Sequence, residues 1–254
     1  MISFTTAELN ALLATLLWPA FRALGIFLTA PVLSHRALPR PAKIGLAFAI
    51  ALVLAPVLPA PPPVMLGSAA SFAILAQQIA IGAALGFAVR LAMAAIEMAG
   101  EMIGLQMGLS FAGFFDLSNP QGANAAGSLL SLTATLLFLS LDGHLMLIAA
   151  LAESFRAFPV GEFPARLIAS DDFTRLGGQV FSIALGLSLP MITVMLFANL
   201  ALGVIARAAP QLNIFSFGFP FSIVLGMLAL YFTVPYLGEP LERTISQSLA
   251  VFLR

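Results

Sequence analysis

The chain has 254 residues, of which 61% are hydrophobic and only 9% are charged, and its 11 Lys and Arg residues balance its 11 Asp and Glu residues. Soluble globular proteins carry about 25% charged residues, so the composition excludes an ordinary soluble domain. The balanced charge excludes a nucleic-acid-binding surface. The absence of cysteine excludes disulfides, thiolate metal sites and cysteine nucleophiles.

The charged residues are concentrated in a few places, which leaves long stretches without any charge. The longest uncharged stretches are residues 44–89, 117–141, 176–206 and 208–238. A membrane-spanning helix needs about 20 apolar residues to cross a hydrocarbon core about 30 Å thick. Each of the four stretches is longer than that, so we expect a polytopic, all-α integral membrane protein with membrane lipid around it.

The first apolar segment covers residues 9–33 and leads into a basic loop. Arg36, Arg40 and Lys43 lie in this loop without an acidic neighbour. Short loops rich in Lys and Arg favour the cytoplasmic side of a membrane. We therefore expect this loop in the cytoplasm and the N-terminus on the opposite side.

Five further apolar segments follow the basic loop. They cover residues 44–58, 64–89, 126–151, 176–205 and 214–237. A straight helix over residues 176–206 would be roughly 46 Å long, which is too long for one unbroken span. Since Pro190, Pro220 and Pro235 lie in the last two segments, we expect broken and kinked helices there.

Small residues predict where helices approach one another closely. Gly82 and Gly86 lie one helical turn apart in the third segment, a spacing that admits a second helix. A longer stripe recurs every fourth residue in the amphipathic stretch 91–115. It consists of Gly100, Gly104 and Gly108. We expect this stripe to pack against another helix.

Ionisable residues inside apolar segments are costly and need a reason. Asp142 and His144 lie within the segment 126–151. They form either a proton relay or metal-ligand pair, or a structural cap at the end of a segment. No second histidine nearby and no carboxylate cluster completes a metal site, so a structural role is favoured. Arg22 and Arg207 are expected to be polar structural residues, as counter-ions or as anchors at segment ends.

Enzyme signatures do not occur in the sequence. It contains no zinc-protease helix motif, no nucleophile elbow and no phosphate-binding loop, and its glycines follow helix-packing spacing instead of nucleotide-loop spacing. We expect a protein that is not an enzyme and that uses no cofactor and no metal ion.

Several short motifs together resemble those of a known family. The central ones are Gly104-Leu105-Gln106-Met107-Gly108-Leu109-Ser110 and Leu141-Asp142-Gly143-His144, and the C-terminal ones are Pro210-Gln211-Leu212-Asn213-Ile214-Phe215 and Gly218-Phe219-Pro220. On these residues, and over nearly the whole length, the chain resembles the FliR/SctT family of type III secretion export-gate proteins.

The resemblance implies a single subunit of a larger helical export gate in the bacterial inner membrane, at the flagellar basal body. Residues 1–170 would be FliP-like and residues 171–254 would be a FliQ-like helical hairpin. The expected partners are FliP-like, FliQ-like and FlhB-like subunits and the exported unfolded polypeptides. The glycine stripe would pack on such partners. The gate of an injectisome, and more remotely a proton-coupled secondary transporter that uses Asp142 and His144, are the alternatives.

The family's plug loop falls on residues 108–122 of this sequence. The residues that would form the plug are Gly108, Leu109, Ser110, Phe111, Ala112, Phe114, Phe115 and Asp116. The three phenylalanines would help to seal the closed pore. The family also resembles an assembly raised partly out of the bilayer plane, so we expect a simple count of six crossings to be wrong in detail.

Overall fold

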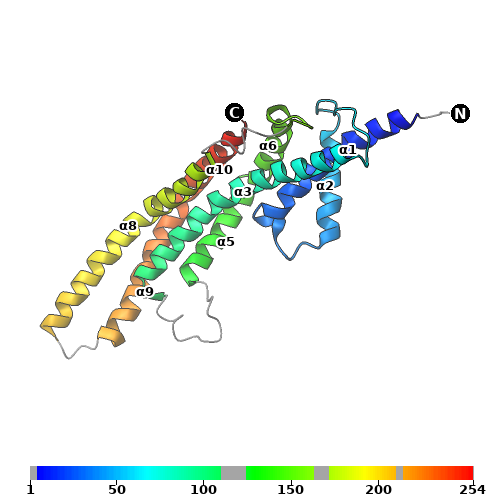
Figure 1. Cartoon of the computed structure of the whole chain (residues 1–254). Helices are drawn as coiled ribbons and strands as arrows, with labels where there is room; N and C mark the ends of the chain where they lie inside the picture. Colours follow the sequence, from blue (N-terminus) through cyan, green and yellow to red (C-terminus); the bar gives the residue numbers. More distant parts are fainter. Residues whose placement is uncertain (1–4, 110–123, 163–171, 210–213, 254) are drawn as a thin grey trace. The chain divides into compact units, whose positions relative to one another are not determined.

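The regular elements of the described part of the chain are all helices. A computed structural model describes residues 5–109, 124–162, 172–209 and 214–253 (Figure 1). The α-helices are α1 (Thr6–Thr29), α2 (Arg40–Leu54), α3 (Ala69–Gln106), α5 (Ala125–Ser140), α6 (Gly143–Ala157), α8 (Asp172–Ala208), α9 (Ile214–Thr233) and α10 (Gly238–Leu253). Two 3₁₀ turns, η1 (Val32–Ser34) and η2 (Val234–Tyr236), follow α1 and α9. The predicted all-α class is confirmed.

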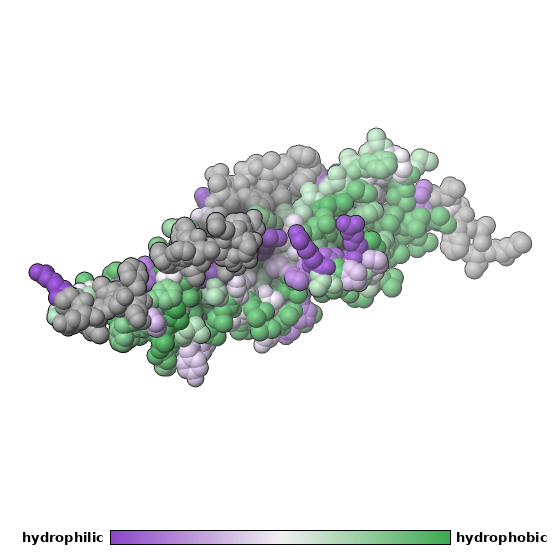
Figure 2. Space-filling model, turned by 90° about the horizontal axis from the view of Figure 1, so that it is seen from below, coloured by the Kyte–Doolittle hydropathy of each residue, from purple (hydrophilic) through white to green (hydrophobic). Residues whose placement is uncertain are grey.

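Four of these helices are long and apolar enough to cross a membrane, namely α1, α3, α8 and α9. The α5–α6 pair is sharply bent and would make a fifth span if it is counted as one. The surface agrees with a membrane location, because the face shown in Figure 2 is largely hydrophobic. Four or five spans replace the six simple crossings that the segment count predicts, mainly because α2 has only 15 residues.

Three segment boundaries differ from those predicted. Helix α3 continues through Arg90, since a single exposed arginine does not interrupt helical hydrogen bonds. Helix α8 also continues through Pro190, so the expected break there is wrong; one proline removes one donor and kinks a helix without always ending it. By contrast, the segment 126–151 is divided at Asp142.

The helices form two compact units. The first contains α1, α2, the part of α3 up to Arg90, α6 and the part of α10 from Thr244. The second contains the rest of α3, α5, nearly all of α8, α9 and the beginning of α10. In the first unit, α1 crosses α3 in direct backbone contact. A Cβ atom added at Gly25 would lie 2.8 Å from the Ala83 nitrogen, and one added at Gly86 would lie 2.8 Å from the Ala30 nitrogen. The close approach predicted at Gly82 and Gly86 is confirmed.

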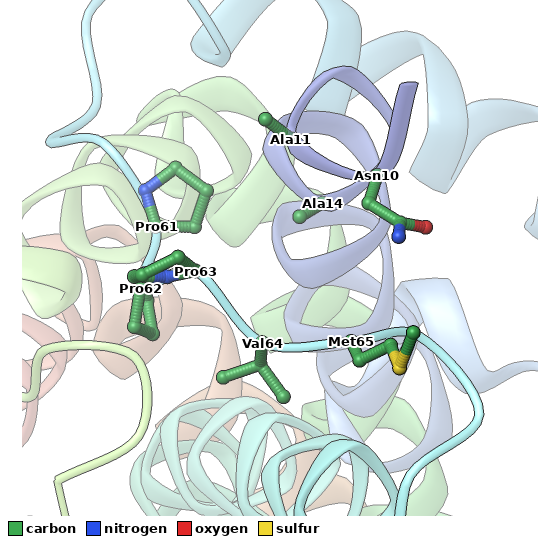
Figure 3. Close-up of a pocket in the computed structure, with 8 residues that line it drawn as sticks. All are labelled: Asn10, Ala11, Ala14, Pro61, Pro62, Pro63, Val64 and Met65. Atoms are coloured by element: carbon green, nitrogen blue, oxygen red, sulfur yellow. The ribbon is translucent and has the colours of Figure 1, made fainter. Parts of the chain in front are cut away.

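The proline-rich connection between α2 and α3 folds back onto α1. Ala14, Trp18 and Ile74 form a buried cluster there, and Val64 and Leu66 from the connection pack against it. A shallow groove of about 260 Å³ lies where Pro61–Val64 pass Asn10 and Ala14 (Figure 3). The proline-rich connection therefore covers the N-terminal half of α1.

In the second unit, α8 and α9 form a helical hairpin and pack on the last turns of α3 (Figure 1). The Ser188 hydroxyl of α8 donates to the Met102 sulfur of α3 at 3.4 Å. Gly226 of α9 leaves room for Met107, because a Cβ there would lie 2.6 Å from the methionine sulfur. Ser222 and Asn199 join α9 to α8 by a hydrogen bond of 3.4 Å.

Candidate functional site

The candidate site is the pair of helix ends that carry residues 110–123. These ends are the last turns of α3 and the first turn of α5, and the second unit contains both. The glycine stripe lies at this place. A Cβ atom on Gly100 would lie 2.8 Å from the Gly127 Cα and 2.9 Å from the Ala126 oxygen. The backbones of α3 and α5 therefore touch at Gly100, and no larger residue fits there without a shift.

Asn124 joins the two helix ends one turn further along. Its side-chain oxygen accepts a hydrogen bond from the Ala126 nitrogen at 3.1 Å, which caps α5. Its side-chain nitrogen donates to the Glu101 carbonyl at 3.2 Å. The amide lies directly over Gly104, where a Cβ would overlap it. One buried side chain thus holds the start of α5 on the end of α3.

The chain leaves α3 at Gly108. This glycine has a φ of 77°, a left-handed conformation that side chains disfavour. Its nitrogen donates to the Leu105 carbonyl at 3.1 Å. The Phe219 ring of α9 lies 3.1 Å from the position of a Cβ on Gly108. The residue just before it, Met107, is fully buried. The end of α3 is therefore packed against α9 at Met107 and at Gly108.

Only the first two residues of the predicted plug lie in the described part of the chain. Gly108 and Leu109 are partly buried. The others lie outside the described residues, namely Ser110, Phe111, Ala112, Phe114, Phe115 and Asp116. Their role stays a prediction. For the glycine stripe, the structure shows neighbours within the same chain, α5 for Gly100 and Gly104 and the Phe219 ring for Gly108; packing on partner subunits stays a prediction as well.

A second polar cluster surrounds Arg22 in the first unit. The guanidinium is fully buried and donates to Gln78 Oε1 at 2.7 Å, to Ser154 Oγ at 3.0 Å and to the Phe158 carbonyl at 2.8 Å. It also lies over the Phe155 ring, 3.7 Å from the centroid, a cation–π contact. Arg22 therefore connects α1 to α3 and to the C-terminal end of α6.

No carboxylate among the described residues pairs with this buried cation, since the ion pairs found there involve Arg156 and Arg243. The negative end of the α6 dipole and three neutral acceptors take the place of a counter-ion. The Nε2 atom of Gln78 and the Nε1 atom of Trp18 are buried and make no hydrogen bond to the described residues. The cluster thus has more donors than acceptors.

Asp142 and His144 lie at the bend between α5 and α6. Asp142 has a φ of 54° and an exposed side chain that makes no capping hydrogen bond, while its carbonyl accepts from the nitrogens of Leu145 and Met146. His144 Nδ1 is buried and makes no hydrogen bond to the described residues. The two side chains therefore do not form a pair that shares a proton. Among the residues described, no group of three potential ligands could hold a metal ion.

Arg207 occupies the last turn of α8 and is exposed. A cation at this position interacts favourably with the helix dipole. It makes no ion pair with a described residue. Its role as an anchor at a segment end stays a prediction.

Comparison with known sequences identifies the protein family of this chain. The family of bacterial export proteins, family 1, matches residues 13–248. A flagellar biosynthetic protein FliR from Pectobacterium carotovorum subsp. carotovorum is 41% identical over 248 residues, which cover 97% of this chain and 94% of the relative. The chain belongs to the FliR family of bacterial export proteins.

Further relatives carry the same name. The FliR protein of Escherichia coli (strain K12) is 40% identical over 97% of this chain and 94% of its own length. That of Bacillus subtilis (strain 168) is 30% identical over 84% of this chain and 85% of its own length. Membership of the FliR family makes the chain a membrane component of a bacterial protein-export apparatus, and the relatives connect that apparatus with the biogenesis of the flagellum.

Proposed function

We propose that the chain is a core subunit of the flagellar type III protein export gate, which forms and seals the channel through which unfolded flagellar subunits cross the bacterial inner membrane. The proposal locates the seal in residues 108–122. The full-length similarity to FliR proteins supports the flagellar system over the injectisome.

The observation that carries this proposal is the joint between Asn124 and Glu101. It fixes the start of α5, directly after the stretch 110–123, to α3 at Glu101, and Gly108 turns the chain at the end of α3. Because these contacts fix the helix ends, the displacement of the joining segment that the proposal requires would leave α3 and α5 in place. A seal needs such a rigid frame.

Phenylalanine side chains suit the seal chemically. Phe111, Phe114 and Phe115 carry no charge and no hydrogen-bonding group. A constriction lined by such side chains excludes water and therefore blocks ions. An extended polypeptide would displace the segment and replace the aromatic contacts with its own side chains.

The partners proposed are FliP-like, FliQ-like and FlhB-like subunits. Residues 1–170 would take the place of a FliP-like subunit and residues 171–254 that of a FliQ-like hairpin in one helical ring. Helices α8 and α9 support this role because their outer surface is strongly apolar and largely exposed, as at Phe197, Leu200 and Phe232. Such a surface requires either lipid or neighbouring helices.

Ion conductance of the assembled gate tests the sealing role. Replacing Phe111, Phe114 and Phe115 with serine should raise ion leakage through a gate reconstituted with its co-purified subunits, and deletion of Ser110–Asn119 should do the same. The matched control replaces three exposed leucines of α5 with serine, namely Leu129, Leu132 and Leu136. Conductance that stays at the level of the unsubstituted gate in the phenylalanine variant would show that these rings are packing residues.

A further inference from the structure

The loop between α1 and α2 carries an uncompensated positive charge. No Asp or Glu occurs between Glu8 and Glu97, whereas Arg36, Arg40 and Lys43 all lie in this loop or in the first turn of α2. Arg36 and Arg40 are exposed. The described ion pairs, Arg156 with Glu153 and Arg243 with Glu239, involve neither of them. Both guanidinium groups are therefore open to an external anion.

Local hydrogen bonds give the loop a defined form. Lys43 Nζ donates to the Ser34 carbonyl at 2.8 Å and ties the first turn of α2 to η1. Within the loop, the Ala37 nitrogen donates to His35 Nδ1 at 3.2 Å, and the Leu38 nitrogen donates to the His35 carbonyl at 3.2 Å. The two arginines thus extend from a closed turn, and little backbone entropy is lost when they bind a ligand.

Helix α2 continues from the basic loop with one buried and one exposed face. Ala47 and Ala51 are fully buried, and α2 packs on α1. Ile44, Phe48 and Leu52 recur every fourth residue and are 48%, 40% and 65% exposed. The exposed stripe begins one turn after Arg40. A cationic end followed directly by an apolar face matches a phospholipid, whose anionic headgroup adjoins its acyl chains.

We propose that Arg36 and Arg40 bind the phosphate headgroups of anionic phospholipids, with the Ile44, Phe48 and Leu52 stripe against the acyl chains. Phosphatidylglycerol is the simplest lipid with this chemistry. Guanidinium groups form bidentate hydrogen bonds to phosphate oxygens. The apolar stripe favours a lipid over an acidic protein segment, which would need only the cationic end.

The test compares binding of phosphatidylglycerol and phosphatidylcholine. The full chain is purified with its co-purifying export subunits, reconstituted in nanodiscs that contain both lipids, and the preference is measured with spin-labelled lipids. A basic residue near an anionic surface contributes about five-fold in affinity. R36Q should therefore lower the preference for phosphatidylglycerol about five-fold, and R36Q/R40Q should lower it further.

The matched control is R156Q/R243Q, which removes two arginines that are each paired with a glutamate of the same helix. It should leave the lipid preference unchanged. R36K/R40K should retain most of the preference, since the charge is kept. Inorganic phosphate should displace the lipid no better than sodium chloride of equal ionic strength, because phosphate lacks the acyl chains.

Two results would overturn the proposal. The first is an unchanged lipid preference in R36Q/R40Q; if this variant also loses a co-purifying subunit, the basic loop is a protein-docking surface. The second is an equal loss of lipid preference in the R156Q/R243Q control.

Discussion

The side-chain nitrogen of Asn124 donates a hydrogen bond of 3.2 Å to the carbonyl of Glu101, and this contact fixes the first residue after the stretch 110–123 to the helix that precedes it. The same amide caps α5 through the Ala126 nitrogen. A single side chain therefore controls both where α5 begins and where it lies on α3.

Replacing Asn124 with alanine should destabilise the protein by about 1–2 kcal/mol, because the α5 cap and the bond to Glu101 are both lost. Asn124→Ser keeps a capping oxygen and loses only the donor to Glu101, so its effect should be smaller. Thermal unfolding in detergent measures the stability of both variants. Asn199→Ala is the matched control, since Asn199 also makes an interhelical hydrogen bond but is exposed. Equal loss in the two asparagine variants would contradict the special role of Asn124.

Gly104→Ala should destabilise the protein by about 1–3 kcal/mol, because the new Cβ would overlap the Asn124 amide and push α5 away from α3. Gly186→Ala and Gly203→Ala on α8 meet no atom within 4 Å. These two substitutions should be neutral or slightly stabilising, since alanine favours a helix by up to about 1 kcal/mol over glycine. A Gly104→Ala protein that unfolds at the wild-type temperature would show that the helices separate without cost.

Arg22→Met should cost about 3 kcal/mol or more, because Gln78, the Phe158 carbonyl and Ser154 lose a charged donor in a buried site. Arg22→Lys should recover only part of the stability, since an ammonium group cannot reach three acceptors in the plane of a guanidinium. Arg207→Met provides the exposed comparison and should change the free energy of unfolding by less than about 0.5 kcal/mol. Chemical unfolding gives the free energy of unfolding of the three variants. An Arg22→Met protein as stable as Arg207→Met would contradict a stabilising role of the buried guanidinium.

Substitutions of Asp142 show whether this residue is needed for its backbone conformation or for its charge. Its φ of 54° favours glycine or asparagine over residues with branched side chains. Asp142→Asn and Asp142→Gly should retain protein export and stability, whereas Asp142→Val should lose about 1–2 kcal/mol of stability. Export assays and unfolding curves measure these effects. Loss of export in a stable Asp142→Asn protein would instead restore the proton-relay hypothesis for this residue.

Several features of the fold follow from local sequence signals. The uncharged runs predict the apolar helices, and Gly82 and Gly86 predict a close helix crossing, which the structure shows to be with α1. The second apolar segment is expected to reach residue 58, but α2 ends at Leu54, shortly before Pro56. Other boundaries depend on hydrogen bonding that composition does not show. Arg90 does not end α3, and Pro190 does not end α8.

The polar clusters were predictable only in part. Arg22 is an expected structural residue, but its partners Gln78, Ser154 and Phe158 lie 56, 132 and 136 residues away in sequence. No local pattern identifies contacts over such separations. Asn124 was missed at the sequence level. A single asparagine before an apolar run is a recognisable helix N-cap signal, and it would have located the start of α5.

Contact between the proposed seal and a passing polypeptide tests the central claim most directly. A photo-crosslinking amino acid at Phe114, with one at the exposed Leu132 of α5 as control, is introduced into cells in which an export substrate is stalled in the gate. The proposed function predicts crosslinks to the stalled substrate from position 114 and none from position 132. Crosslinks from position 114 to lipid or to neighbouring subunits alone, with the substrate stalled, would contradict a role of residues 108–122 in sealing the channel.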